Sequence, residues 1–307
     1  MKIGLIDVDG HSNFPNLALM KISAWHKQQN HEVSFCDGLF GGKYDKVYMS
    51  KVFTESKHFE QVINCDDIIR GGTGYDLTTD LPAEVELMYP DYSIYNVSSA
   101  YGYLTRGCPR GCKFCIVGDK EGLKSVQVAE LPNFWNGQKE IILLDPNLLA
   151  CKTADKLLQD LINSKAWIDF TQGLDIRFMT DARAELLNQM KVKMIHFAWD
   201  NYEFKTYELL KKYRSKLNYS IKKLAVYVLT NFTTTHEQDL ERVYKLKELK
   251  YDPYIMIYDK YNAPENTRKL QRWVNNKILF GAVDRFENVK QDRKLATKEY
   301  NKRKVMR

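Results

Sequence analysis

The most chemically informative feature of the sequence is a group of three cysteines within eight residues. Cys108, Cys112 and Cys115 follow the spacing C-x3-C-x2-C, with Pro109 and Gly111 between the first two. Glycine lets the backbone turn tightly, so the three sulfurs of such a loop can converge. Converging thiolates are ligands for soft metal centres. The spacing therefore predicts a metal site.

Two kinds of metal centre use ligands of this type. A structural zinc site takes four protein ligands, but no histidine occurs between His58 and His196, and the nearest further cysteine is Cys151. An iron–sulfur cluster also usually has four cysteine ligands, so a loop of three would leave one iron open to a substrate or cofactor. We expect the iron–sulfur cluster, with zinc as the alternative.

The cysteines follow the first of a series of short apolar segments that alternate with helical patterns. One strand and its return helix form a βα unit, and six or seven such units in series make a full or partial (β/α) barrel. We expect a partial (β/α)6 barrel of the TIM type over residues 96–284, with an open sheet as the alternative. The predicted strands are 100–106, 141–145, 167–172, 194–199, 224–230, 254–259 and 277–283, and the predicted helices are 153–164, 181–190, 203–213 and 236–250.

The first ninety residues predict a separate α/β unit. A helical run at 16–29 stands among four apolar strands, at 2–8, 32–37, 46–53 and 66–72. This alternation is typical of a small Rossmann-like parallel sheet with helices on its faces. A linker at 80–96, with Pro82 and Pro90, places a domain boundary near residue 95, so the expected domains are 1–95 and 96–284, followed by a basic helical tail, 285–307.

The cysteine loop resembles that of the radical S-adenosylmethionine superfamily. The resemblance rests on the spacing of Cys108, Cys112 and Cys115, on Phe114 before the last of them and on the preceding barrel strand, and it covers about residues 98–260. It implies that the three cysteines hold a [4Fe–4S] cluster whose fourth iron binds S-adenosylmethionine. One electron, from a reductant such as flavodoxin or ferredoxin, would cleave this cofactor to methionine and a 5′-deoxyadenosyl radical that abstracts a substrate hydrogen.

The same resemblance gives roles to polar residues that follow two further strands. Asp145 and Asn147 stand where the family usually has a Gly-Gly-Glu type turn, and they could accept hydrogen bonds from the cofactor's amino group. Gln172, Asp175 and Arg177 follow the next strand. Asp175 could accept ribose hydroxyls and Arg177 could bind the cofactor carboxylate, although a local salt bridge between these two is the alternative. With Phe114, these are the expected cofactor-binding residues.

Several other polar residues at the strands have structural alternatives. Asp200, Thr230 and Asn231 also follow strands and could line the pocket, but such residues equally often cap the next helix. His196 lies within an apolar strand, where a hydrogen-bonded core histidine is the expected role. No substrate and no residue that reacts directly with one can be assigned from the sequence.

The N-terminal segment resembles the cobalamin-binding-like domain that precedes many barrels of this superfamily. Its corrin-binding members can carry Asp-x-His-x-x-Gly after the first strand, and this chain has Asp9 and His11 but Phe14 in place of the glycine. The later Ser-x-Leu is replaced by Ser-Lys-Val at 50–52, while a Gly-Gly pair is present at 71–72. Since Phe14 would crowd a corrin, we expect no cobalamin and take the glycines as a tight turn.

Two other functions remain open. Methylthiotransferases share this type of barrel but hold a second cluster on three cysteines of the first domain, where this chain has only Cys36 and Cys65. We expect both to be small buried apolar residues. A cobalamin-dependent methyltransferase acting on RNA or protein is a related alternative. The third is a protein whose iron–sulfur cluster is regulatory or structural rather than catalytic.

Composition and charge narrow the setting. Of the net charge of +7, residues 285–307 carry +6, with nine Lys or Arg and three Asp or Glu, so the other residues sum to about +1. A basic terminal helix is usually solvated, and a nucleic-acid partner is the less favoured alternative. The apolar runs are far shorter than the ~18 residues that a spanning helix needs, and the first ten residues do not form an export signal. We expect a cytoplasmic protein.

Overall fold

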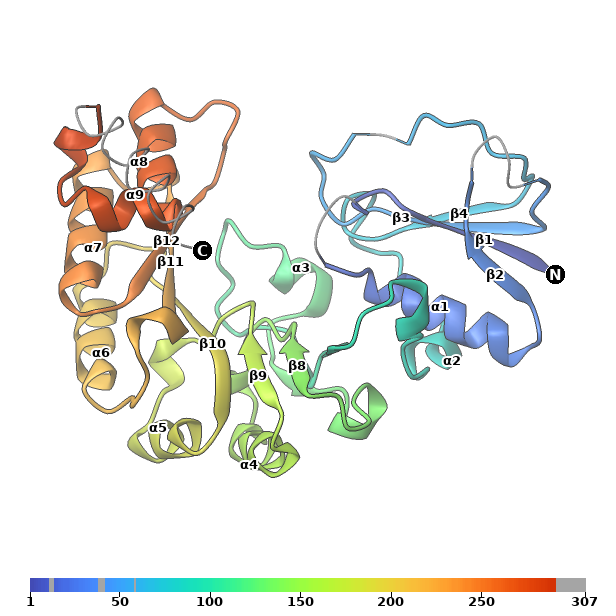
Figure 1. The fold of residues 1–307 in the computed structure, drawn as a ribbon, viewed down its shortest axis with the longest axis horizontal. Helices are drawn as coiled ribbons and strands as arrows, with labels where there is room; N and C mark the ends of the chain where they lie inside the picture. Colours follow the sequence, from blue (N-terminus) through green and yellow to red (C-terminus); the bar gives the residue numbers. More distant parts are fainter. Residues whose placement is uncertain (11–13, 38–41, 58, 291–307) are drawn as a thin grey trace, which may run out of the picture.

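The computed structural model describes residues 1–10, 14–37, 42–57 and 59–290. The N-terminal sheet is parallel throughout and has the strand order β2-β1-β3-β4 (Figure 1). Its strands are β1 (Lys2–Asp7), β2 (Glu32–Phe35), β3 (Lys46–Ser50) and β4 (Ile68–Gly71), and α1 (Leu17–Gln28) connects the first two. This arrangement confirms the Rossmann-like parallel sheet.

Only one face of this sheet is covered by helices. On that face Ile3 and Leu5 pack against Leu19 of α1 and Val85 of α2 (Ala83–Glu86). The opposite face is covered by the non-helical connection between β3 and β4, which lies on the other side of the sheet from α1 (Figure 1). The expected helices therefore lie on one face of the sheet in the described residues, because apolar residues of a coil segment can bury the other face as helices do.

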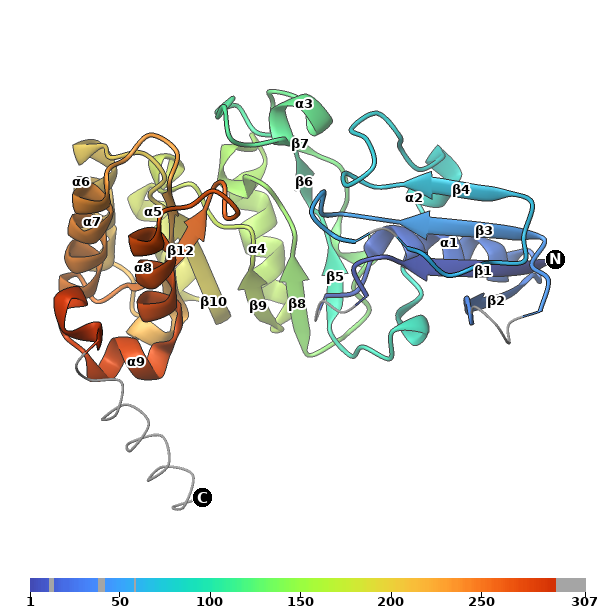
Figure 2. The ribbon, with the colours of Figure 1, turned by 90° about the horizontal axis from the view of Figure 1, so that it is seen from above.

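The second sheet is larger and also parallel, with six strands in chain order across it. Neighbouring strands pair in the order β12-β11-β10-β9-β8-β5 (Figure 2). Because the first and last strands are edges, the sheet does not close, and it forms the expected partial (β/α)6 arrangement. Its strands are β5 (Ala100–Gly102), β8 (Glu140–Leu143), β9 (Trp167–Phe170), β10 (Lys191–Ala198), β11 (Leu224–Thr230) and β12 (Asp252–Ile257).

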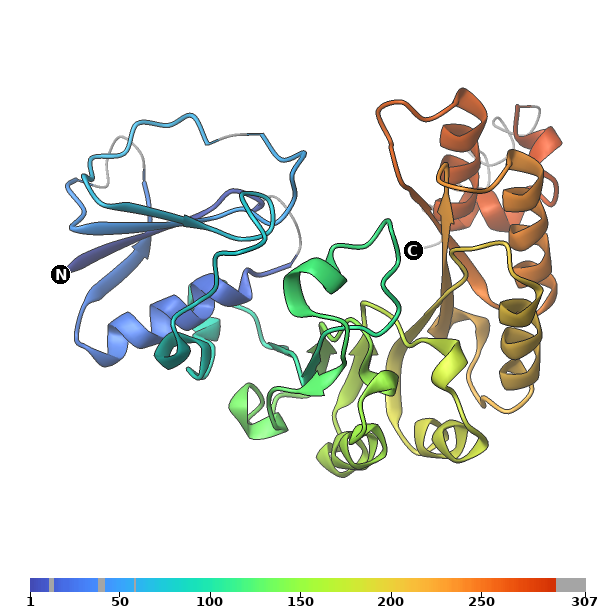
Figure 3. The ribbon, with the colours of Figure 1, turned by 180° about the vertical axis from the view of Figure 1, so that it is seen from behind.

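Helices pack against the outer face of this sheet (Figure 3). Local signals set where they begin. Thr180 accepts a hydrogen bond from the Arg183 amide at the start of α5, and Thr235 forms a capping box with Gln238 at the start of α7. The helices are α4 (Ala154–Ser164), α5 (Asp181–Asn188), α6 (Phe204–Arg214), α7 (His236–Glu248) and α8 (Glu265–Asn275).

The last predicted strand is a helix. Residues 277–283 contain α9 (Lys277–Ala282), and the side chain of Asn276 accepts a hydrogen bond from the Leu279 amide at 3.0 Å. The ring of Phe280 lies 5.0 Å from that of Trp273 in α8. A short apolar run does not distinguish a strand from a buried helix. Here the cap and the contact with α8 favour the helix.

The end of the chain is only partly described. Of the expected basic helical tail, the described part holds the 3-10 helix η6 (Phe286–Lys290), and the remainder lies outside the described residues. Within the described ranges, none of the helices has the length and apolar character needed to cross a membrane.

Candidate functional site

The cysteine loop stands on a small antiparallel ribbon rather than directly on the main sheet. The expected strand 100–106 is divided, because β5 ends at Gly102 and β6 (Thr105–Arg106) pairs with β7 (Val126–Gln127). Gly107 opens the loop with a φ of +84°, and a Cβ atom there would lie 2.1 Å from the carbonyl oxygen of Lys124. Only glycine has room for this close approach. Gly107 therefore lets the two ends of the loop come together at its base.

The cysteine thiols of the loop interact electrostatically with one another. Cys108 and Cys112 are half-buried and Cys115 is exposed, and all three are free. The Cys108 amide donates to the Gly122 carbonyl at 3.1 Å, and the Cys115 amide donates to the Cys112 carbonyl at 2.9 Å. Burial raises the pKa of Cys112 and of Cys115, and the neighbouring thiols raise both further. A bound cation would reverse this shift by favouring the thiolates.

The three thiols are chemically suited to an iron–sulfur cluster, although they do not surround a common centre in the structure. No three His, Cys, Asp or Glu side chains of the described residues are grouped so that they could hold a metal ion. The loop nevertheless supplies three free cysteines, the soft ligands that iron–sulfur clusters use. Ligation by Cys108, Cys112 and Cys115 stays a prediction, and it requires their side chains to turn toward one another.

Asp145 ties the end of β8 to the start of the cysteine loop. Its side chain is buried, and its carboxylate accepts hydrogen bonds from the Leu104 amide at 3.2 Å and from the Thr105 amide and hydroxyl at 2.5 and 2.7 Å. Burial raises the pKa of Asp145 to about 6. These bonds fasten the loop after β8 to the junction of β5 and β6. The carboxylate thus stabilises the fold, and its expected contact with a cofactor amino group stays a prediction.

Asn147 lies against the cysteine loop. Its side-chain amide nitrogen is 3.3 Å from the Cys108 sulfur and 3.5 Å from a carboxylate oxygen of Asp175. Because a carboxylate only accepts hydrogen bonds, the atom of the Asn147 side chain that faces Asp175 is the amide nitrogen. The Asn147 carbonyl oxygen, Oδ1, is buried and has no partner among the described residues. An acceptor left in this state costs about 1–3 kcal/mol unless a ligand supplies a donor.

Asp175 contacts side chains from three segments at the C-terminal ends of the strands. It forms a bidentate pair with Arg177, whose Nε and Nη2 donate at 2.6 and 3.1 Å. Arg110 of the cysteine loop lies 3.9 Å from the same carboxylate. Asn147 completes the group from the end of β8. The predicted salt bridge is therefore present, and Gln172 lies exposed nearby along the chain without joining it.

Pairing with Asp175 leaves part of Arg177 for a ligand. A guanidinium has five N–H donors, and two of those of Arg177 are used by Asp175. Its side chain is 25% exposed. The salt bridge and a bond to a cofactor carboxylate are thus compatible, and the contact with Asp175 holds the guanidinium in place.

Phe114 extends the site toward the last strands of the sheet. Its ring meets Phe232 edge-on, with 5.6 Å between centroids, and Phe232 in turn lies 4.7 Å from Tyr258. Phe232 follows β11 and Tyr258 follows β12. These contacts place Phe114 of the cysteine loop beside the residues that follow β11 and β12. The cofactor contact expected for Phe114 stays a prediction.

The remaining strand-end residues serve mainly to hold the sheet edge. None of Asp200, Thr230 and Asn231 caps the following helix, since α6 begins after Glu203 without a side-chain cap and α7 is capped by Thr235. Thr230 donates to the Met256 carbonyl at 3.1 Å, and Asn231 donates to the Asp259 carbonyl at 3.1 Å. These bonds join the loops after β11 to β12.

The surroundings of His196, Cys36 and Cys65 can be compared with the roles expected for them. His196 has the expected partner, since its Nδ1 lies 3.0 Å from the Phe170 carbonyl and its ring stacks on Tyr227 at 4.8 Å. Burial lowers the pKa of His196. Cys36 and Cys65 are only half-buried, beside the core of the first domain, and burial raises the pKa of Cys36 to about 11.

Sequence reasoning missed Arg242, which links the C-terminal ends of β10 and β11. Arg242 is fully buried in α7 and pairs with Asp239 at 2.5 Å. It also donates to the carbonyls of Asp200 and Leu229 at 3.0 and 2.7 Å, which lie at the ends of β10 and β11. Its i, i+3 spacing from Asp239 was the only available signal, and such pairs are usually exposed. Nearby, burial raises the pKa of Asp200 to about 6.

Comparison with known proteins identifies the fold. No protein-family model and no curated protein matches the sequence. Among solved structures, the radical S-adenosylmethionine methyltransferase TsrM from Kitasatospora setae, with cobalamin and a [4Fe–4S] cluster bound, is similar to 83% of this chain. The similarity covers 74% of TsrM, at 13% identity and a TM-score of 0.60.

A second structure of TsrM, with tryptophan substrate and the analogue aza-SAM bound, gives the same result. It covers 83% of this chain and 72% of TsrM, at 12% identity and a TM-score of 0.61. At this level of identity the likeness concerns the fold, and it extends over both sheets. The chain thus shares its fold with this radical S-adenosylmethionine methyltransferase.

Proposed function

We propose that the chain is a radical S-adenosylmethionine enzyme in which Cys108, Cys112 and Cys115 hold a [4Fe–4S] cluster. When bound, the cluster and the cofactor would supply a 5′-deoxyadenosyl radical that abstracts a hydrogen from the substrate, after reduction by a carrier such as flavodoxin or ferredoxin. The fold supports this proposal. So do the contacts of Cys108 with Asn147 and of Arg110 with Asp175, at the C-terminal ends of β8 and β9.

The observation that carries the proposal is the unpaired carbonyl oxygen of Asn147. This buried acceptor lies on the side chain whose nitrogen contacts Cys108. A cofactor amino group held next to the cysteine loop would supply the missing donor. Asn147 thereby takes over the role that we expected for the pair of Asp145 and Asn147, while Asp145 holds the loop in place.

The other residues would bind and orient the cofactor. Arg177 has N–H donors left to bind the cofactor carboxylate, and Asp175 fixes its position. Phe114 and Phe232 lie beside the loop and would exclude water from the reacting centre. Each role rests on this chain's own contacts, and the substrate remains unassigned.

Cobalamin is implied by the fold family, and the residues compared with its motif fall into two groups. Ser50, Gly71 and Gly72 line a cavity between the two sheets, whereas Asp9 is engaged in other contacts. Asp9 accepts hydrogen bonds from the Val52 amide and from the Ser56 hydroxyl, which ties the loop after β1 to the end of β3. Gly72 is needed for packing, since a Cβ there would lie 2.3 Å from the Lys51 carbonyl oxygen. His11 lies outside the described residues. The expected absence of cobalamin stays a prediction.

Anaerobic reconstitution tests the proposal. The purified chain, given iron, sulfide, dithionite and S-adenosylmethionine, should contain about four irons and release 5′-deoxyadenosine, measured by liquid chromatography with mass spectrometry. Zinc in place of iron, or a full cluster with no cleavage of the cofactor, would contradict it. The second of these results would support the alternative of a non-catalytic iron–sulfur protein, and eight irons would support a methylthiotransferase.

A further inference from the structure

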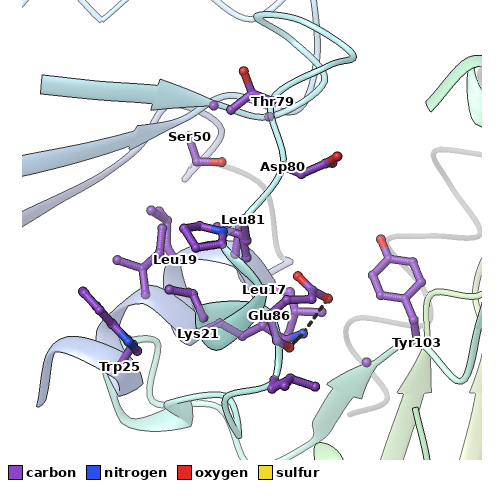
Figure 4. Close-up of a pocket in the computed structure, with 18 of the residues that line it drawn as sticks. Leu17, Leu19, Lys21, Trp25, Ser50, Thr79, Asp80, Leu81, Glu86 and Tyr103 are labelled. Carbon is purple, nitrogen blue, oxygen red and sulfur yellow. Dashed lines mark hydrogen bonds and ion pairs between the residues drawn. The ribbon is translucent and has the colours of Figure 1, made fainter. Parts of the chain in front are cut away.

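A second site is suggested by a cavity between the two sheets, apart from the edge that carries Asn147 and Asp175. The cavity has a volume of about 760 Å³. One wall is formed by α1, β4 and the segment 79–87, and the opposite wall by β5, β6 and β7 (Figure 4). Sites for small organic molecules commonly have volumes of ~300–1,000 Å³ and lie between domains.

The walls of this cavity hold apolar side chains that are unusually exposed. Ile69, Leu87, Val126 and Val128 are 40, 75, 50 and 47% exposed, and all four line the cavity. They come from β4, from the segment after α2 and from the two ends of the β7 region. Single exposed apolar residues are common, but several around one hollow indicate a binding surface.

The charged groups of the walls largely neutralise one another. Glu86 pairs with Lys21 at 2.8 Å and with Arg106 at 3.3 Å, and Lys120 pairs with Asp80 at 2.6 Å. Figure 4 shows Lys21 and Glu86 joined at the edge of the cavity, across from Tyr103. A lining with paired charges does not favour a highly charged ligand such as a nucleoside triphosphate.

One corner of the cavity carries hydrogen-bond donors that nothing in the described part of the chain accepts. Arg106 Nε is buried without a partner. The guanidinium lies over the Tyr103 ring, 4.5 Å from its centroid, and both residues line the cavity. Burial raises the pKa of Tyr103 to about 12, so its hydroxyl keeps its proton at neutral pH. Two donors in one corner call for an acceptor oxygen on the ligand.

We propose that this cavity binds a largely apolar organic molecule that presents a carbonyl or carboxylate oxygen to Arg106 and Tyr103. The apolar body would lie against Leu87, Val126 and Val128. Arg106 directly precedes Gly107, the base of the cysteine loop. The ligand would therefore sit close to the cluster site without using the residues that bind the cofactor.

The first test measures binding of the fluorescent probe 1-anilinonaphthalene-8-sulfonate to cluster-free protein. The probe has an apolar aromatic body and an acceptor sulfonate, and we expect one saturable site per chain. Val128→Trp and Leu87→Trp should each fill the cavity and weaken binding at least tenfold, while circular dichroism confirms folding. Val62→Trp is the matched control, since Val62 is 82% exposed and does not line the cavity.

The second test addresses the donor corner. Tyr103→Phe removes one hydroxyl and should weaken probe binding by about 2–10-fold, the effect of one hydrogen bond. Tyr261→Phe, at a 77% exposed tyrosine outside the cavity, should have no effect. Unchanged binding in the two tryptophan variants, or stoichiometric displacement of the probe by hydroxocobalamin, would overturn the proposal. Neither result depends on the cluster, so the test is separate from that of the proposed function.

Discussion

The side chain of Asn147, at the end of β8, contacts the sulfur of Cys108 at 3.3 Å. The two residues are 39 positions apart in the chain, and their contact joins the main sheet to the cysteine loop. N–H groups that donate to ligand sulfurs stabilise the more negative, reduced state of an iron–sulfur cluster. Asn147 would thus influence both cofactor binding and the reduction of the cluster.

The first prediction concerns this contact. Asn147→Ala should retain the cluster but lower its reduction potential, because the sulfur loses a donor. An electron paramagnetic resonance titration against potential measures this effect. Asn163→Ala, in α4 and away from the loop, is the control. A potential equal to that of the wild type would show that Asn147 does not donate to a ligand sulfur.

Replacing the cysteines tests the ligand assignment directly. Alanine at Cys108, Cys112 or Cys115 should remove the brown absorbance of anaerobically reconstituted protein, because each would ligate one iron of the same cluster. Cys151→Ala is the control, since this buried cysteine lies after β8 and outside the loop. Full iron content in any one loop variant would exclude that cysteine as a ligand.

Arg177 allows a test of cofactor binding. A charge-assisted hydrogen bond contributes about 1.5–3 kcal/mol, so Arg177→Ala should weaken S-adenosylmethionine binding by about one to two orders of magnitude while cluster content survives. The affinity can be measured on cluster-loaded protein by electron paramagnetic resonance. Arg268→Ala serves as the control, because Arg268 is an exposed residue of α8, outside the group around Asp175. If affinity is unchanged, Arg177 only pairs with Asp175.

Offering cobalamin tests the expectation about the first domain. After desalting, the protein should remain colourless, since Asp9 and Gly72 are already committed to contacts with the segment after β3. Absorbance of the corrin and a cobalt determination provide the measurement. One bound corrin per chain would contradict this expectation and would favour the methyltransferase alternative.

The carboxyl group of Asp169, in β9, should make the stability of the protein depend on pH. Burial raises its pKa to about 6, and its Oδ1 has no partner among the described residues, although Lys193 lies 3.9 Å from the other carboxylate oxygen. A raised pKa means that the folded state binds the extra proton, so this contribution to stability is lost as pH rises from about 4 to about 6.

The matching variant is Asp169→Asn, which stays neutral at every pH. At pH 7.5 it should be more stable than the wild type by about 1 kcal/mol, after allowance for partial exposure and for Lys193. Below pH ~4 the two proteins should have equal stability, because the wild-type carboxyl is then protonated. Urea unfolding at both pH values measures the difference. A variant that is less stable at pH 7.5 would show that the charged Asp169–Lys193 pair stabilises the fold.

The sequence by itself was sufficient to place most of the elements and to predict the ligand chemistry of the cysteine loop. Strands such as β1 and β11 are continuous apolar runs, and helices such as α7 begin at strong caps, so local patterns are sufficient to place them. The spacing of Cys108, Cys112 and Cys115 lies within one loop and is therefore readable without the fold. These signals are local in the chain.

Tertiary structure decided which way the polar side chains at the strand ends turn. Asp145 and Asn147 are two residues apart, yet one binds Thr105 and the other contacts Cys108. Residues 277–283 contain a helix rather than the predicted strand, and the ring of Phe280 packs on Trp273 of α8. In each case the choice depends on a partner far away in the chain or in a separate element, and the free energy of that contact is not encoded in the local sequence pattern.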